Sequence, residues 1–156
     1  MSRSKSQRVS RLEDHVGYWL RFVSNHVSAS FARRLEKLDI SVSEWVAMRK
    51  LYDEPAPSSS SALAEAMGMT KAPVSRLVER LVQKDLVERR ASQEDGRAQE
   101  IRLSSIGQKL VPRLAAIADQ NDAAFFGDLP ESTRSALIAL MRQIVTQSRL
   151  TETPVD

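Results

Sequence analysis

The feature that most constrains this chain is an amphipathic stretch that begins after Thr70. Its apolar residues recur at steps of three and four, which places them on one buried face of a helix. Pro73 then falls in the first turn, where a backbone N–H has no intrahelical partner, so we expect Thr70 to cap the helix. The buried stripe is Val74, Leu77, Val78, Leu81 and Val82, and the opposite, polar face carries Lys71, Ala72, Ser75, Arg76, Glu79 and Arg80.

Shorter elements are predicted on both sides of that helix. A compact helix over residues 61–67 should end at Gly68, because glycine is a common C-terminal stop. Further along, apolar and polar residues alternate around Arg102, and Asp95-Gly96 is a strong signal for a tight hairpin turn. A helix, a turn, a longer helix and a two-stranded ribbon make a winged helix-turn-helix, so we predict a mainly α fold with a small β-wing.

Cap signals place two more helix starts. Ser41 and Glu44 have the spacing of a capping box, which predicts a helix from there through about Tyr52. A Pro/Ser connector follows, and one of its serines should cap the helix of residues 61–67.

Long amphipathic helices are predicted outside this central unit. Residues 11–40 should form one helix, and residues 104–150 two helices separated near residues 127–130. Such helices cannot bury their apolar stripes within one small domain, so we expect a partner subunit to cover them. The stripe residues are Leu12, Val16, Leu20, Val23, Val27, Phe31, Leu35 and Leu38, then Ile106, Leu110, Leu114, Ile117 and Phe125, and last, facing inward, Leu137, Leu140, Met141, Ile144 and Val145.

The run LAEAMGMTKAPVSRLVERLVQKDLVERR, followed by DGRAQEIRLSSIG, closely resembles the MarR family of bacterial transcriptional regulators. Members share a helix-turn-helix, an Asp-x-Arg-Ala wing and a Leu-Ser/Thr-x-x-Gly entry into the next helix. Asp95, Arg97 and Ala98 match the wing, and Leu103, Ser104 and Gly107 match the helix entry. The resemblance covers all but the two tails, and it implies a two-fold homodimer made by interleaved terminal helices.

We therefore expect a homodimer that binds double-stranded DNA at a pseudo-palindromic operator, with two recognition helices about one DNA turn apart. The expected division is a disordered basic tail (1–10), an N-terminal dimerisation helix (11–40), a winged helix-turn-helix DNA-binding domain (41–103), C-terminal dimerisation helices (104–150) and a tail (151–156). The basic tail could add phosphate contacts or be a solvated end.

Positions on the central helix suggest individual DNA contacts. Lys71 and Arg76 are candidates for guanine edges, because Lys and Arg pair with the guanine acceptors of the major groove. The shorter side chains of this face are candidates for contacts with phosphates or thymine methyls. They are Thr70, Ala72, Pro73 and Ser75.

The remaining candidate contacts are basic. Arg97 at the wing tip should enter the minor groove, where narrow A·T-rich stretches concentrate negative potential. The family's wing motif implies that Asp95 holds this arginine in position. Arg80, Arg89 and Arg90 are expected to neutralise phosphates, which sets affinity and salt dependence, although Arg89 and Arg90 could equally be solvated surface charges.

The resemblance also implies a small effector, often an aromatic acid or its thioester, in a crevice between the dimer helices and the DNA-binding lobe. The candidate effector-binding residues include rings that could stack on the effector and cations that could pair with its charge. They are His15, Trp19, Trp45, Met48 and Arg49. Core packing is the alternative for the two tryptophans and the methionine, and solvent exposure for the arginine.

Composition bounds these expectations. The net charge is +3, but residues 1–11 hold four basic and no acidic residues, so the rest of the chain sums to −1 and charge alone does not establish DNA binding. Without cysteine there is no disulfide, thiolate metal site or cysteine redox switch. His15 and His26 stand eleven residues apart on one predicted helix, too far to chelate one metal.

No enzyme motif, cofactor or metal site is therefore predicted, since a Gly-rich phosphate loop and a nucleophile elbow are also missing from the sequence. No apolar run is long enough for a membrane span, and the N-terminus lacks the apolar core of a signal peptide, so we expect no membrane association and a cytoplasmic protein bound to the nucleoid through DNA.

The expected function is a transcriptional regulator, more often a repressor, which leaves its operator when a small effector binds. Three alternatives stay open: a regulator of the same fold without a ligand, a winged-helix adaptor that docks protein, and a ligand-binding protein that has lost its affinity for DNA.

Overall fold

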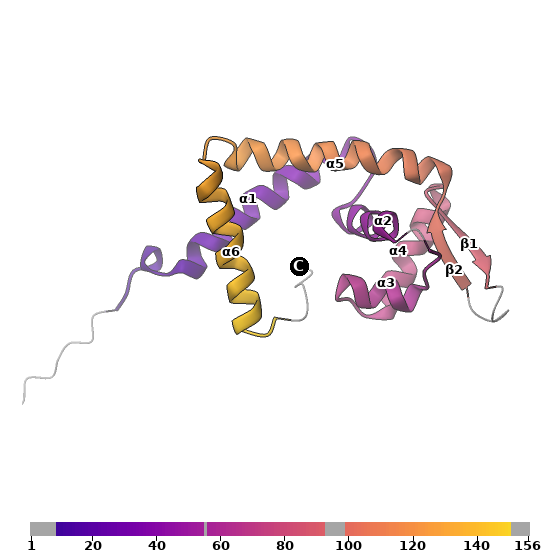
Figure 1. The fold of residues 1–156 in the computed structure, drawn as a ribbon, viewed down its shortest axis with the longest axis horizontal. Helices are drawn as coiled ribbons and strands as arrows, with labels where there is room; N and C mark the ends of the chain where they lie inside the picture. The colour runs from indigo at the N-terminus through magenta and orange to yellow at the C-terminus, as the bar shows by residue number, and fades with distance from the viewer. Residues whose placement is uncertain (1–8, 55, 93–98, 151–156) are drawn as a thin grey trace, which may run out of the picture.

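The computed structural model describes residues 9–54, 56–92 and 99–150. Its long helix α5 (Ser105–Phe126) runs along one side of the molecule, with α1 (Val16–Glu36) beside its C-terminal half (Figure 1). Helix α6 (Glu131–Gln147) descends from one end of α5, and the central unit lies at the other end. That unit consists of α2 (Val42–Asp53), α3 (Ser60–Met67), α4 (Lys71–Gln83), β1 (Val87–Ala91) and β2 (Gln99–Leu103).

The predicted amphipathic helix is α4, and its buried stripe is confirmed. Val74, Leu77, Val78 and Leu81 are at most 1% exposed, and Val82 is half-buried. They pack in a core to which every element of the central unit contributes, together with the C-terminal end of α1 and the first half of α5. The other buried apolar residues of this core are Leu35, Ile40, Ala47, Met48, Leu51, Leu63, Ala64, Met67, Leu86, Val87, Ile101, Leu103, Val111 and Leu114.

Most of the predicted helix caps are confirmed. The capping box of α2 is present, with Glu44 N donating to Ser41 Oγ at 3.1 Å and Ser41 N donating to the Glu44 carboxylate at 2.8 Å. Ser59 caps α3 by accepting from Ala62 N at 3.0 Å, and Gly68 ends that helix with a φ of 64°.

Thr70 occupies the N-cap position of α4, but its side chain makes no capping hydrogen bond. The prediction of a side-chain cap is therefore wrong. The helix start is set instead by the tight turn after α3, where Met69 N donates to Ala64 O at 2.9 Å.

The wing is an antiparallel pair in which Val87 lies opposite Leu103 and Ala91 opposite Gln99. Ile101 and Leu103 point into the core while Arg102 is exposed, as the alternation predicted. Ser58 in the connector forms a β-bridge with the outer edge of β2. Its backbone exchanges two hydrogen bonds of 2.7 and 2.9 Å with that of Ile101.

The N-terminal arm differs from the single helix that was predicted from Leu12. A short 3-10 turn, η1 (Leu12–Asp14), comes first, and His15 has an extended backbone (φ −100°, ψ 125°) that separates it from α1. Only Leu35 of α1 is buried within the chain. The first half of the predicted stripe is therefore at the surface, with Val16 72% exposed.

The C-terminal arm also differs in which side chains are covered. Ile106 and Phe125 are 57% and 41% exposed, whereas Val111 and Leu114 of α5 are buried. Ile106 is turned outward because its neighbour Gly107 fits closely against the backbone of Leu86.

Helix α6 has no buried residue. Leu137 and Met141 are half-buried, while Leu140, Ile144 and Val145 are exposed, so a single chain leaves most of this predicted stripe uncovered. None of the described helices is both long and apolar enough to cross a membrane.

Candidate nucleic-acid interface

Helix α4 presents a polar face opposite its buried stripe. Lys71, Ala72 and Arg76 are exposed there, and Pro73 and Ser75 are half-buried. Small side chains between the two cations keep this surface shallow, and a helix of this kind can enter a major groove about 12 Å wide. Thr70 is exposed at the start of the same face.

Lys71 and Arg76 differ from the other candidate cations in their surroundings. Neither side chain forms an ion pair or hydrogen bond with any residue among 9–54, 56–92 and 99–150, and both residues are exposed. Both are therefore available to hydrogen-bond acceptors outside the chain.

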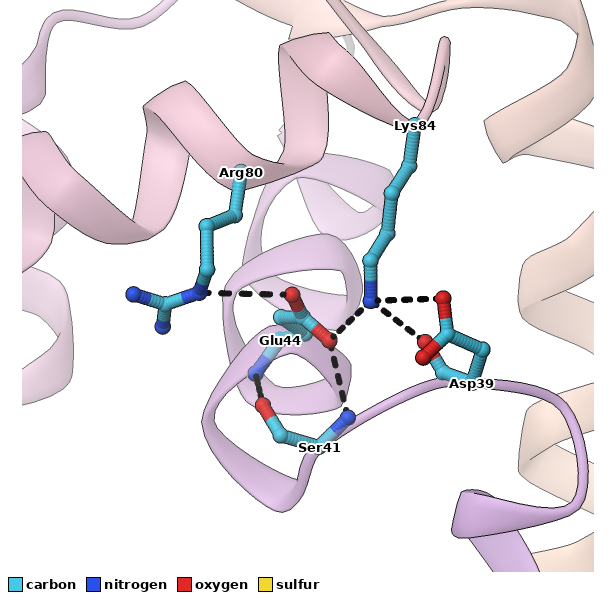
Figure 2. Close-up of polar contacts among 5 residues, drawn as sticks. All are labelled: Asp39, Ser41, Glu44, Arg80 and Lys84. Carbon is cyan, nitrogen blue, oxygen red and sulfur yellow. Dashed lines mark hydrogen bonds and ion pairs between the residues drawn. The ribbon is translucent and has the colours of Figure 1, made fainter.

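Arg80 lies one turn after Arg76 and is engaged within the chain. Its Nε lies 3.6 Å from Oε1 of Glu44, and its side chain is 52% exposed. Figure 2 shows its two terminal nitrogens pointing away from Glu44. The guanidinium is therefore held against α2 on one edge and open on the other.

The cations of β1 are paired with neighbouring acids. Arg89 donates to Glu79 of α4 at 2.7 Å, and Arg90 lies 3.4 Å from Glu88. Arg102 of β2 shares that same Glu88 at 3.3 Å. Exposed pairs of this kind contribute little free energy, so a phosphate could compete for these arginines, but in the free chain their charge is largely balanced.

Two predicted contacts belong to the wing tip. Asp95 and Arg97, together with Ala98 of the same motif, lie outside the described residues. Their roles stay predictions.

The predicted effector residues fall into two groups in one chain. His15 and Trp19 lie at the exposed start of α1, where Trp19 Nε1 donates to Glu13 O at 2.9 Å. Trp19 is 49% exposed and belongs to a series of ring contacts with Tyr18 and Phe22.

The second group is on α2, near the other end of α1. Met48 is fully buried in the core, and the half-buried Trp45 packs edge-on against Phe31 with ring centroids 6.4 Å apart. Arg49 pairs with Asp53 and lies over the ring of Tyr52. Within one chain these groups do not form a common pocket, and Met48 in particular has the core position that was its alternative.

The contacts that surround Glu44 were not predicted from the sequence. This carboxylate is 3% exposed and contacts Lys84 and Arg80, which stand four residues apart and share one side of α4 and its C-terminal cap (Figure 2). An open groove of about 500 Å³ runs beside it, bordered also by Arg33 and Glu36 of α1. The i, i+4 spacing of the two cations was visible in the sequence, but nothing there indicated which helix they would face.

No three His, Asp or Glu side chains come together as a metal-binding group in the part of the chain that the structure describes.

These features define a winged helix-turn-helix protein whose central helix leaves a basic face open. Comparisons with known sequences and structures show which proteins it is similar to. Residues 38–98 match the sequence model of the MarR family. Over these residues the chain is similar to the MarR family of transcriptional regulators.

Solved structures share this fold over nearly their whole length. A probable transcriptional regulator from Pseudomonas aeruginosa is 25% identical with a TM-score of 0.76, over 86% of this chain and 99% of that one. BpsR from Bordetella bronchiseptica, whose DNA binding is regulated by 6-hydroxynicotinic acid, is 23% identical with a TM-score of 0.77, over 88% and 97%. CouR from Rhodococcus jostii RHA1, solved with p-coumaroyl-CoA, is 20% identical with a TM-score of 0.76, over 95% and 100%.

Proposed function

We propose that this chain is a homodimeric repressor that inserts α4 into the major groove of a pseudo-palindromic operator and leaves it when a small effector binds. The observation that carries the proposal is the open basic face of α4. Lys71 and Arg76 have no partner among the described residues, while Arg80, Arg89 and Arg90 all do. A cation that is not engaged within the chain can hydrogen-bond a base edge without first breaking an ion pair.

The assigned roles follow from these surroundings. Arg76 and Lys71 contact guanine edges, and the shorter side chains Thr70, Ala72, Pro73 and Ser75 contact phosphates or thymine methyls. Arg89 and Arg90 contact phosphates after exchanging their acidic partners, whereas Arg80 keeps its contact with Glu44 and reaches a phosphate with the two nitrogens that point away from it. Arg97, positioned by Asp95, reaches the minor groove.

Exposed apolar side chains support the homodimer. They gather on the first half of α1, the end of α5 and α6, which are the elements that lie away from the central unit in Figure 1. Many large apolar side chains exposed on the same elements mark an interaction site, and a second copy offers the same surface. Its members include Leu12, Val16, Trp19, Leu20, Phe22, Val23, Phe125, Leu129, Ile138, Leu140, Ile144, Val145 and Leu150.

An aromatic acid or its thioester is the proposed effector class. The support comes from the 6-hydroxynicotinic acid that regulates BpsR and the p-coumaroyl-CoA bound to CouR, and from the exposed rings of Trp19 and Phe22 with His15 nearby. The two candidate groups on α1 and α2 do not meet within one chain, so we propose that the second subunit completes the crevice. A bound effector would then change the separation of the two α4 helices and lower affinity for DNA.

Selection from a random-sequence duplex library followed by fluorescence anisotropy tests the function. We expect an enriched, two-fold-symmetric sequence that binds at least about a thousandfold more tightly than unrelated DNA at the same salt concentration. Titration of that complex with 6-hydroxynicotinic acid and with p-coumaroyl-CoA then tests the effector class. Equal, weak binding to all duplexes that vanishes as salt rises would contradict the proposal, because only phosphates would be recognised.

A further inference from the structure

Glu44 is the one acidic side chain among the described residues that the core of the central unit buries. Its Oε2 accepts from Ser41 N at 2.8 Å and from Lys84 Nζ at 3.1 Å, and its Oε1 lies 3.6 Å from Arg80 Nε (Figure 2). Burying a carboxylate is unfavourable unless it is paired and hydrogen-bonded. Oε2 is both hydrogen-bonded and paired, and Oε1 lies at ion-pair distance from Arg80, so cations of α4 and its C-terminal cap balance the buried charge.

The two roles of this side chain have different chemical requirements. The capping box at the start of α2 needs an acceptor at residue 44, and Gln serves there as well as Glu. The contacts with Lys84 and Arg80 need a negative charge. A local helix cap alone therefore does not account for a buried carboxylate at this position.

Lys84 connects Glu44 to a third element. Its Nζ also donates to the backbone carbonyl of Asp39 and lies 3.4 Å from the Asp39 carboxylate, in the turn between α1 and α2. This turn is tight, since Asp39 has a φ of 57°. The ammonium at the end of α4 thus binds the end of α1 and the start of α2 together.

The residues that follow α4 also contact the start of α5. Ser104 Oγ donates to the carbonyl of Asp85 at 2.5 Å, and Ser104 N donates to Leu86 O at 3.0 Å. The C-terminal end of α4 is therefore held between two sets of contacts, and the set around Glu44 is the one that depends on charge.

We propose that Glu44 is a positioning residue for DNA recognition: through Lys84 and Arg80 it fixes the orientation of α4 against the corner between α1 and α2. This inference rests on the proposed function, since it concerns how α4 meets the groove. Arg76 and Lys84 are eight residues apart, about 12 Å along a helix, so a change of angle at the C-terminal end displaces the side chains that contact bases. Hydrogen bonds to base edges tolerate little displacement, whereas phosphate attraction tolerates much more.

The discriminating variant is Glu44→Gln, which keeps the capping acceptor and removes the charge. Glu36→Gln is the matched control: Glu36 borders the same groove, is exposed, makes no ion pair with a described residue, and changes the net charge equally. The probe is the duplex that the wild-type protein enriches from the random library, measured beside an unrelated duplex at one salt concentration. Each protein is checked for its folded fraction by circular dichroism and for its mass by light scattering at the assay temperature.

For Glu44→Gln we expect affinity for the enriched duplex to fall about tenfold and affinity for unrelated DNA to stay within about twofold of the wild type. Glu36→Gln should keep both values. A merely structural role would lower both affinities by the same factor, because only the folded fraction would change. That outcome, or equal behaviour of the two Gln variants, overturns the inference while leaving the proposed function intact.

Lys84→Met keeps the inference testable if Glu44→Gln does not fold. It breaks the same contact from the α4 side, and it should likewise lower affinity for the enriched duplex more than affinity for unrelated DNA. The double variant should bind no more weakly than the weaker single one, since both changes remove one interaction. Independent, additive losses would overturn the inference, and failure of the wild type to enrich any sequence would overturn the proposed function together with it.

Discussion

Gly107 lies directly against the backbone carbonyl of Leu86. A Cβ built on Gly107 would overlap that oxygen and come within 3.2 Å of Leu103 Cδ2. Because the two segments approach so closely, the Ser104 side chain can cap α5 while the Ser104 backbone N–H donates to Leu86 O. The first turn of α5 therefore packs on the chain that leaves α4. The Gly of the Leu-Ser-x-x-Gly sequence thus has a packing reason that can be tested.

Gly107→Ala should destabilise the protein by about 1–3 kcal/mol, the usual cost of forcing extra volume into a packed site. Urea unfolding followed by circular dichroism measures this loss. Gly17→Ala is the control, because nothing lies within 4 Å of its built Cβ and Ala is the better helix former. If the two variants unfold at the same urea concentration, the contact with Leu86 is not as tight as described.

The serine and threonine caps should differ in stability. Ser59→Ala removes a side chain that accepts from Ala62 N, so we expect a loss of about 1 kcal/mol. Thr70→Ala removes no capping hydrogen bond and should change the free energy of unfolding by less than about 0.5 kcal/mol. The same urea series compares the two. A loss from Thr70→Ala as large as that from Ser59→Ala would show that Thr70 does cap α4.

Local patterns predicted the central unit well. The stripe of α4, the Ser41 capping box and the stop at Gly68 all depend on residues within four positions of each other, which a sequence displays directly. The alternation around Arg102 likewise predicted which strand residues are buried. These signals need no tertiary contact, so the features could be predicted from the sequence.

Features that depend on contacts between residues far apart in the chain could not be predicted from the sequence. Glu44 and Lys84 are forty residues apart, and the pattern of α2 alone did not show that its N3 carboxylate would be buried under α4. The rotation that exposes Ile106 follows from the contact of Gly107 with Leu86, which no periodicity reveals. The break before α1 falls at His15, which is neither Pro nor Gly, and the nearest glycine, Gly17, lies inside α1.

Arg76→Ala should weaken binding to the enriched duplex by about 1–3 kcal/mol, roughly 10- to 150-fold, because one base-edge interaction is lost. Affinity for unrelated DNA should fall much less. Arg113→Ala is the charge-matched control, since Arg113 is exposed on α5 and has no ion pair with a described residue. Anisotropy with both duplexes at one salt concentration makes the comparison. Equal losses on the two duplexes would mean that Arg76 contacts phosphate rather than a base.

The exposed face of α6 gives the sharpest test of the homodimer. Leu140 is 56% exposed in the single chain, and under the proposed assembly a second subunit covers it. Leu140→Asp would place a charge in that interface, where an unpaired carboxylate is strongly disfavoured. Light scattering should then report the 17.5 kDa of one chain instead of twice that mass, and DNA affinity should fall because only one half-site is held at a time.

Ile106→Asp separates loss of the dimer from a general effect of adding charge to an apolar site. Ile106 is 57% exposed, almost the same fraction as Leu140, but it lies at the start of α5 beside the wing, at the opposite end of that helix from α6 (Figure 1). An aspartate in the first turn of a helix is also favourable for the helix dipole. This variant should therefore stay dimeric. A monomeric Ile106→Asp, or a Leu140→Asp that keeps the dimer mass, would place the subunit interface on a different face of the chain.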